Sequence, residues 1–132
     1  SVSAEPPLLI FSISALSSSS DALSRAETVV VHLLDANDID VAKLGASRGV
    51  DRFAQAQSWS RLPTGEPLYD GVRAWVRCAV IDRMDAGTST VIAAHALESG
   101  FGRELGAGDA GDALVYHNRA WHRLSDQSRI DA

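Results

Sequence analysis

Two long runs of strand-forming residues that lie only four residues apart restrict the fold of this chain more than any other feature. The first run covers residues 72–83 (VRAWVRCAVIDR) and the second covers residues 88–97 (TSTVIAAHAL). Both are rich in apolar and β-branched residues, and the connecting MDAG ends in a glycine, which is typical of a hairpin turn. The sequence therefore predicts an antiparallel hairpin with one face buried and the other partly buried.

The composition indicates one folded domain. A chain of 132 residues with 45 % hydrophobic and 22 % charged residues fits a single domain, residues 1–132, with a substantial core. The net charge is −5 and the arginines are scattered, so we expect no nucleic-acid partner. The single cysteine excludes an internal disulfide and fits a reducing compartment. No apolar run approaches the roughly 18 residues of a membrane span, and we expect a cytoplasmic protein without membrane contact.

The start of the chain predicts a missing segment. Ser1 stands where an initiator methionine would be, only a few residues before a strand, and no signal-peptide pattern follows it. We therefore expect the chain to be truncated at its N-terminus.

Shorter elements surround the predicted hairpin. Short helices are predicted at residues 21–27 and from Asn37 or Asp38, as the cap, to Gly45, as the C-terminal stop. Residues 51–59 form a short helix or turns, residues 61–71 a loop, and residues 98–112 a mobile loop. Further strands are predicted at residues 8–14, 28–34, 113–117 and 120–124. The pattern favours a mainly β protein with short helices, an antiparallel barrel with α insertions.

The first strand runs into four serines, Ser17 to Ser20, and then into a helix start at Asp21. Unpaired N–H groups at a helix start and serine hydroxyls can together hold a phosphate. The alternative is that the serines form only a polar turn, with Ser20 or Asp21 as the N-cap.

Histidine and cysteine residues show no arrangement typical of a metal or nucleophile site. The four histidines lie on separate predicted strands, and we expect no metal. His32 fits a core histidine, His117 an exposed turn residue, and Cys78 a packed thiol. Neither G-x-S-x-G nor a correctly placed G-x-G-x-x-G is present.

Five segments in order nevertheless resemble one family over nearly the whole chain. They are SVSAEPPLLIFSIS, ALSSSSDAL, VVVHLLDANDIDVAKLGA, DRFAQAQSWSRLPTGEPLYDGVRAWVRCAV and LVYHNRAWHRL. Together they are similar to the flavin reductase-like family, the FMN-binding split-barrel proteins that include the reductase components of two-component flavin monooxygenases.

The resemblance implies a fold, a cofactor and a reaction. The fold would be a six-stranded antiparallel split β-barrel that forms a homodimer and holds FMN or FAD near the subunit interface. Strands and a flavin-lining loop would precede Ser1 in the family, so this domain would lack its N-terminal strands. The activity would be hydride transfer from NADH or NADPH to the flavin, and the reduced flavin would pass to a flavin-dependent monooxygenase.

The resemblance also implies site residues. The flavin phosphate would lie in the loop that contains Ser14, Ala15, Ser17, Ser18 and, close by, Ser19. By the same resemblance, Ser1 and Val2 would line the isoalloxazine, whereas Arg52 and Phe53 would lie near the flavin or the nicotinamide.

Two departures from the family pattern keep other functions open. Ser89 stands where the family often has a histidine beside the nicotinamide, and a serine cannot carry charge or handle protons as an imidazole does. Ala15 replaces a basic residue, so the phosphate would depend on serines and backbone N–H groups. The alternatives are a non-catalytic flavin-binding protein that stores or senses flavin, and a β-barrel interaction domain that binds no flavin.

Overall fold

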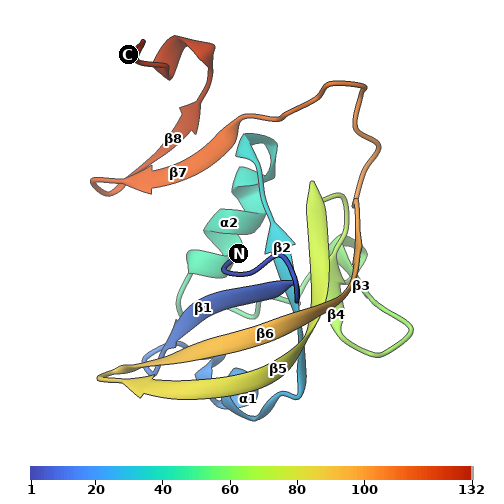
Figure 1. Ribbon diagram of the computed structural model, residues 1–132, viewed down its shortest axis with the longest axis vertical. Helices are drawn as coiled ribbons and strands as arrows, with labels where there is room; N and C mark the ends of the chain where they lie inside the picture. Colours follow the sequence, from blue (N-terminus) through green and yellow to red (C-terminus); the bar gives the residue numbers. More distant parts are fainter. Residues whose placement is uncertain (132) are drawn as a thin grey trace.

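The computed structural model describes residues 1–131, and its centre is a curled four-stranded antiparallel sheet. The strand order in this sheet is β1-β6-β5-β2. The bounds are Leu8–Ser14 for β1, Thr28–Leu33 for β2, Ala74–Ala86 for β5 and Ser89–Gly100 for β6. Figure 1 shows the sheet wrapping as part of a barrel, with β1 and β2 at its open edges. The expectation of a mainly β antiparallel split barrel is confirmed.

The long hairpin β5–β6 forms the two central strands of this sheet, and it is longer than predicted. Residues 84–86 were expected in the turn, but Met84 pairs with Val91 and Ala86 pairs with Ser89. The turn is reduced to Gly87 and Thr88, with Gly87 at φ +64°. A glycine at the first position of a two-residue turn matches the twist of the flanking strands, so the ladder continues up to it.

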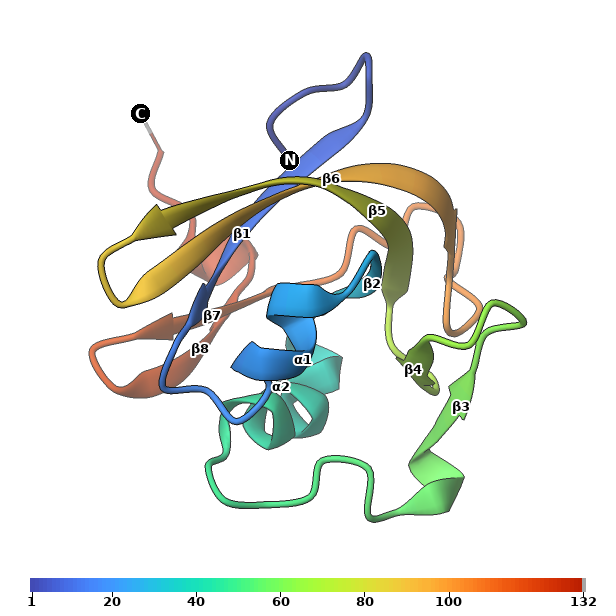
Figure 2. The same ribbon diagram turned by 90° about the horizontal axis from the view of Figure 1, so that it is seen from below.

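The core lies on the concave face of the sheet, beneath α1 (Ser20–Arg25). Val29, Cys78 and Ala94 form the buried cluster, and partly buried side chains such as Phe11 and Leu23 pack against it. Figure 2 shows both α-helices on this concave side. Cys78 is fully buried, and burial raises the pKa of its thiol, which confirms the prediction of a packed thiol.

The second α-helix, α2 (Ile39–Ala46), follows a 3-10 turn, η1 (Ala36–Asp38). Asp38 precedes the helix as predicted, but its carboxylate accepts from the Asp35 N–H at 3.0 Å and makes no cap bond to α2. The predicted stop at Gly45 is wrong, because the helix continues through it to Ala46. Ser47 is the C-cap residue, and its hydroxyl donates to the Lys43 carbonyl at 2.8 Å.

Two small hairpins complete the fold. Their strands are β3 (Trp59–Arg61) with β4 (Pro67–Tyr69), and β7 (Ala113–His117) with β8 (Ala120–Leu124). The second hairpin is confirmed, with His117 exposed at its turn. The β3–β4 hairpin lies partly in the segment that was predicted as a loop, and it follows a 3-10 turn, η2 (Ala56–Ser58). Another 3-10 turn, η3 (Asp126–Ser128), follows β8. Strands of three residues are too short to show the alternation that predicts a strand.

The segment after β6 is anchored rather than free. Residues 98–100, expected in a mobile loop, belong to β6, and Arg103 beyond it pairs with Asp35 at 2.7 Å and with Asp38 at 2.6 Å. Arg73 also pairs with Asp35, at 3.1 Å. Burial alone would raise the pKa of Asp35, but the hydrogen bonds from these two guanidinium groups hold it below its ordinary value. These long-range ion pairs leave no trace in the local sequence pattern.

Candidate functional site

The serine turn connects the end of β1 to the start of α1 and is closed by its own hydrogen bonds. The Ser17 N–H donates to the Ser14 carbonyl at 3.0 Å, and the Ser20 N–H donates to the Ser17 carbonyl at 3.1 Å. The Ser19 N–H donates to the Ser17 hydroxyl at 3.3 Å. Most N–H groups of the turn are therefore already used, and the expectation that they hold an anion is weakened.

Arg52 supplies the positive charge that the turn itself lacks. Its Nη1 donates to the hydroxyls of Ser18 at 3.0 Å and Ser19 at 2.8 Å, and its Nη2 donates to the Ser47 carbonyl at 2.8 Å. All three acceptors are neutral, and no carboxylate within residues 1–131 pairs with this guanidinium. A hydroxyl that accepts a bond still has its hydrogen to donate, so the two serines and Arg52 remain able to bind an anion.

The alternative of a simple serine cap is not supported. Ser19, one residue before the predicted caps, occupies the N-cap position of α1, and it makes no side-chain cap hydrogen bond. Its hydroxyl instead contacts Arg52. The hydroxyls of Ser18 and Ser19 thus accept hydrogen bonds from Arg52, and the Ser19 hydroxyl does not cap the start of α1.

A cavity of about 220 Å³ opens beside Arg52 and the serine turn. Arg48 also lines it, so that two arginines and several serines surround one small space. Its lining residues are Ser14, Leu16, Ser17, Ser18, Gly45, Ala46, Arg48, Gly49 and Arg52. Planar guanidinium groups and hydroxyl donors match the oxygens of a phosphate. The sequence analysis missed Arg48, although two arginines around a glycine just beyond α2 were a visible signal.

Of the other candidate residues, Ala15 and Ser89 lie at the serine turn, whereas Phe53 packs against aromatic side chains. Ser89 lies at the turn, because it pairs with Ser14 across β1 and β6, and the Ala15 N–H donates to the Thr88 carbonyl at 2.9 Å. Phe53 faces a different group: its ring stacks on Tyr69 at 5.7 Å between centroids.

Ser1 and Val2 do not join the serine turn. The Val2 N–H donates to the Leu8 carbonyl at 3.0 Å, at the opposite end of β1. A strand from Leu8 to Ser14 spans roughly 20 Å, so the structure separates these two residues from the turn.

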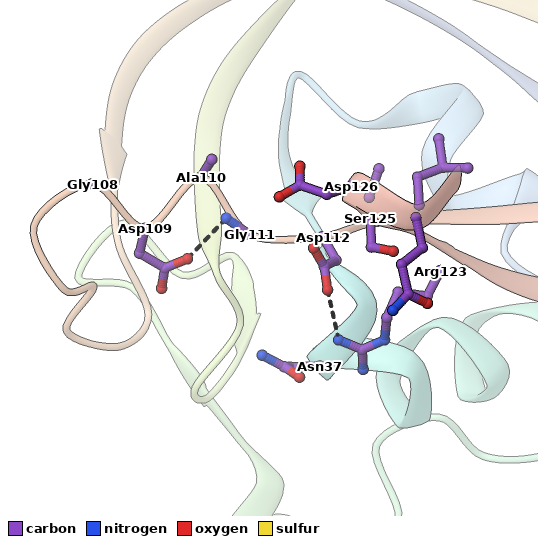
Figure 3. A pocket seen from close by; sticks show the side chains of 12 residues that line it. Asn37, Gly108, Asp109, Ala110, Gly111, Asp112, Arg123, Ser125 and Asp126 are labelled. Atoms are coloured by element: carbon purple, nitrogen blue, oxygen red, sulfur yellow. Dashed lines mark hydrogen bonds and ion pairs between the residues drawn. The ribbon is translucent and has the colours of Figure 1, made fainter. Parts of the chain in front are cut away.

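A larger open pocket of about 920 Å³ lies between residues 108–113 and the end of β8, and its charge does not suit an anion. Figure 3 shows the carboxylates of Asp109, Asp112 and Asp126 around it. Its only arginine, Arg123, is paired with Asp112 at 3.0 Å. Among the described residues there is no group of three potential metal ligands, and no helix is long and apolar enough to cross a membrane.

Comparison with known proteins agrees with this architecture. The flavin reductase like domain matches residues 1–125. The NADH:FMN oxidoreductase of Rhodococcus qingshengii is 36 % identical over 123 residues, which are 93 % of this chain and 63 % of that protein. This chain therefore spans less than two thirds of that relative's length.

Two solved structures share the fold. The flavin reductase domain protein of Arthrobacter sp. FB24 superposes with a TM-score of 0.84 at 24 % identity, covering 99 % of this chain and 76 % of that one. BorF, the flavin reductase component of a bacterial two-component tryptophan halogenase, superposes with a TM-score of 0.76 at 29 % identity, covering 96 % and 78 %. With the domain match extending over nearly its whole length, this chain belongs to the flavin reductase like domain family.

Proposed function

We propose that this protein is a flavin reductase that holds the phosphate of FMN, or the corresponding phosphate of FAD, at the serine turn. The observation that carries the proposal is the charge of Arg52, which contacts Ser18 and Ser19 and has no carboxylate partner within residues 1–131. The adjoining cavity of about 220 Å³ has room for a phosphate group, and its donors suit one. The residues of the turn therefore fit the cofactor that the family name implies.

The side chains of the chain bind and orient the cofactor. Arg52 and Arg48 would neutralise the phosphate charge, and the hydroxyls of Ser17 and Ser18 would donate to its oxygens. When bound, the flavin supplies the redox chemistry by accepting a hydride from NADH or NADPH. Ser89 lies next to Ser14 and carries no ionisable group, so it would not donate or accept a proton as an imidazole does.

We also infer that the reduced flavin serves a second enzyme, a flavin-dependent monooxygenase. BorF, with 29 % identity, is by name the reductase component of a two-component system. In such a division of labour the reductase makes reduced flavin and the partner uses it.

An exposed apolar face supports the further proposal of a homodimer. Ile10 pairs with Ala93 and Met84 pairs with Val91, so these four side chains share one face of the sheet by strand alternation. Ser12 and Asp82 pair with the same two β6 residues and add polar groups to this face. This face is opposite the core, and Ile10 and Met84 are 51 % and 60 % exposed. Apolar side chains gathered on one exposed face are typical of a subunit interface.

The decisive experiment is spectroscopic. The purified full-length protein is titrated with FMN and with FAD, and NADH or NADPH is then added without oxygen. Flavin binding followed by bleaching of the oxidised flavin band is the result expected of a reductase. A flavin band that persists after addition of either nicotinamide would contradict the reductase and support the flavin-storing alternative, which the serine at position 89 favours. A protein that binds neither flavin would contradict both.

A further inference from the structure

Two aromatic side chains hold the backbone that carries Arg52. The Tyr69 hydroxyl donates to the Arg52 carbonyl at 2.7 Å, and the Trp59 indole N–H donates to the Phe53 carbonyl at 3.0 Å. Tyr69 belongs to β4 and Trp59 to β3, so both donors come from one small hairpin. The consecutive carbonyls of Arg52 and Phe53 are thus both held by side chains of the β3–β4 hairpin.

The ring of Phe53 completes this aromatic clamp, which consists of Phe53, Trp59 and Tyr69. Phe53 stacks on Tyr69 with an interplanar angle of 4°, and it meets Trp59 edge to face at 4.9 Å between centroids. Such pairs stabilise a contact beyond the apolar area that they bury. The clamp therefore restrains the residue next to Arg52 on two sides.

The clamp is itself attached to the main sheet through His32 of β2. The Tyr69 N–H donates to Nε2 of His32 at 3.1 Å, so this nitrogen must be unprotonated. Burial lowers the pKa of His32, which favours the neutral ring. His32 was predicted to be a core histidine; it is half-buried, and its ring nitrogen accepts a hydrogen bond from Tyr69.

The segment that carries Arg52 has no regular structure of its own. It lies between the end of α2 at Ala46 and the start of η2 at Ala56. Neither a helix nor a strand ladder therefore fixes the direction of its guanidinium. An unrestrained arginine would lose more conformational entropy on binding an anion than a pre-oriented one does.

We propose that Tyr69 and Trp59 are positioning residues that hold the Arg52 guanidinium at the serine turn, and that they thereby set the preference for a phosphorylated flavin over riboflavin. This inference rests on the proposed function, because it requires the flavin phosphate to lie at Arg52. Neither aromatic residue lines the cavity beside the serine turn, and Tyr69 lines a separate cavity of about 500 Å³ together with Arg52. An effect of these residues on binding at the serine turn would therefore pass through Arg52.

The test compares the dissociation constants of FMN and riboflavin, measured on the full-length protein. Tyr69→Phe removes only the hydroxyl and keeps the ring that stacks on Phe53. We expect it to weaken FMN binding about fivefold, the equivalent of one neutral hydrogen bond, and to leave riboflavin binding unchanged. In an Arg52→Ala background the same substitution should have no further effect.

A second variant and a matched control complete the design. Trp59→Phe removes the other donor and should likewise weaken FMN binding while leaving riboflavin binding unchanged. Thermal unfolding checks that both variants are folded. Tyr116→Phe is the control, because Tyr116 is exposed on the β7–β8 hairpin. It should change neither constant.

The outcomes separate the inference from its premise. Loss of FMN affinity in Arg52→Ala, with no effect of Tyr69→Phe and Trp59→Phe or with an equal effect on FMN and riboflavin, overturns the inference and keeps the phosphate site. Unchanged FMN affinity in Arg52→Ala overturns the phosphate site, and the inference with it.

Discussion

At the scale of single residues, the partners of an arginine determine what it can do. Arg77 pairs with the buried carboxylate of Glu66, and Arg73 and Arg103 pair with Asp35. The charges of these three arginines are therefore neutralised by carboxylates of the same chain. Arg52 contacts only neutral oxygens in the described chain and keeps its charge for a ligand. The same residue type is therefore structural at three positions and a candidate binding residue at one.

The hydroxyls that line the cavity beside Arg52 should matter for binding. Replacing Ser17 and Ser18 together with alanine should weaken FMN binding by about 1–3 kcal/mol, roughly 5- to 150-fold, because hydrogen bonds to a charged group are lost. Ser24→Ala is the control, since the Ser24 hydroxyl donates to the Asp21 carbonyl within α1 and lies outside the cavity. Fluorescence titration of FMN measures both, and equal affinities in the two variants would place the phosphate elsewhere.

Acid stability should depend on Glu66. Burial raises the pKa of this carboxyl, but hydrogen bonds from Thr64, from its own backbone and from Arg77 outweigh burial and lower the pKa from 4.5 to about 2. Because the folded-state pKa lies below the unfolded one, the stabilisation is complete above about pH 4.5 and is lost as the pH falls toward 2. Thermal unfolding between pH 6 and pH 3 should show this loss, and Glu66→Gln should flatten that part of the profile.

The partner of Glu66 offers an independent test. Arg77→Met removes the cation and leaves a buried carboxylate, which should cost about 3 kcal/mol of unfolding free energy. Arg25→Met is the control, because the Arg25–Asp21 pair is exposed and should contribute less than about 1 kcal/mol. Urea denaturation at neutral pH compares them, and equal losses would show that the Glu66–Arg77 pair has no special weight.

At the scale of elements, glycines determine how closely the end of β6 approaches the start of β5. A Cβ built on Gly100 would lie 2.7 Å from the Trp75 ring, and one on Gly102 would collide with the backbone of Val72. Val72 is fully buried, so its backbone cannot move aside without disturbing the surrounding packing. The chain after β6 is thus packed against β5 before it reaches the ion pairs of Arg103.

This close approach makes Gly102 sensitive to the smallest substitution. Gly102→Ala should lower the free energy of unfolding by about 2 kcal/mol, the usual cost of overpacking a rigid neighbour. Gly106→Ala, whose new Cβ would have nothing within 4 Å, should change it by less than about 0.5 kcal/mol. Chemical denaturation of both variants measures the difference, and a neutral Gly102→Ala would mean that the loop shifts freely.

At the scale of the whole molecule, the fold is an open half of a barrel whose outer face exposes large apolar side chains. The sheet ends at β1 and β2 and does not close on itself within the described residues. The outer face that contains Ile10 and Met84 is also uncovered there. An open apolar surface of this kind is expected to be covered by a partner.

Substituting lysine on that face should disrupt the proposed homodimer. Ile10→Lys would bury a charge in the interface and should shift full-length protein from dimer to monomer at micromolar concentration. Ile130→Lys is the matched control, because Ile130 is also an exposed apolar residue but lies beyond β8 near the C-terminus. Light scattering after gel filtration reports the mass, and a dimer that survives Ile10→Lys would place the interface on another face.

The local chemistry of the chain determined its strands, its main hairpin and its buried thiol. Alternation over residues 72–83 and 88–97, with Gly87 between them, was sufficient to predict the β5–β6 hairpin and the burial of Cys78. Side-chain alternation and turn chemistry act over a few residues, so a sequence displays them directly. The strands of the short hairpin β3–β4 were not predicted, because a strand of three residues is too short to show a period-2 alternation.

Only the tertiary structure decided which side chains share a site. Arg52 meets Ser19 across 33 residues of sequence, and Arg103 meets Asp35 across 68. The family resemblance led to the serine turn, but it did not indicate that the Arg52 guanidinium would contact Ser18 and Ser19. A hydrogen bond depends on the distance and direction between two atoms, and for distant residues the folding of the whole chain sets both.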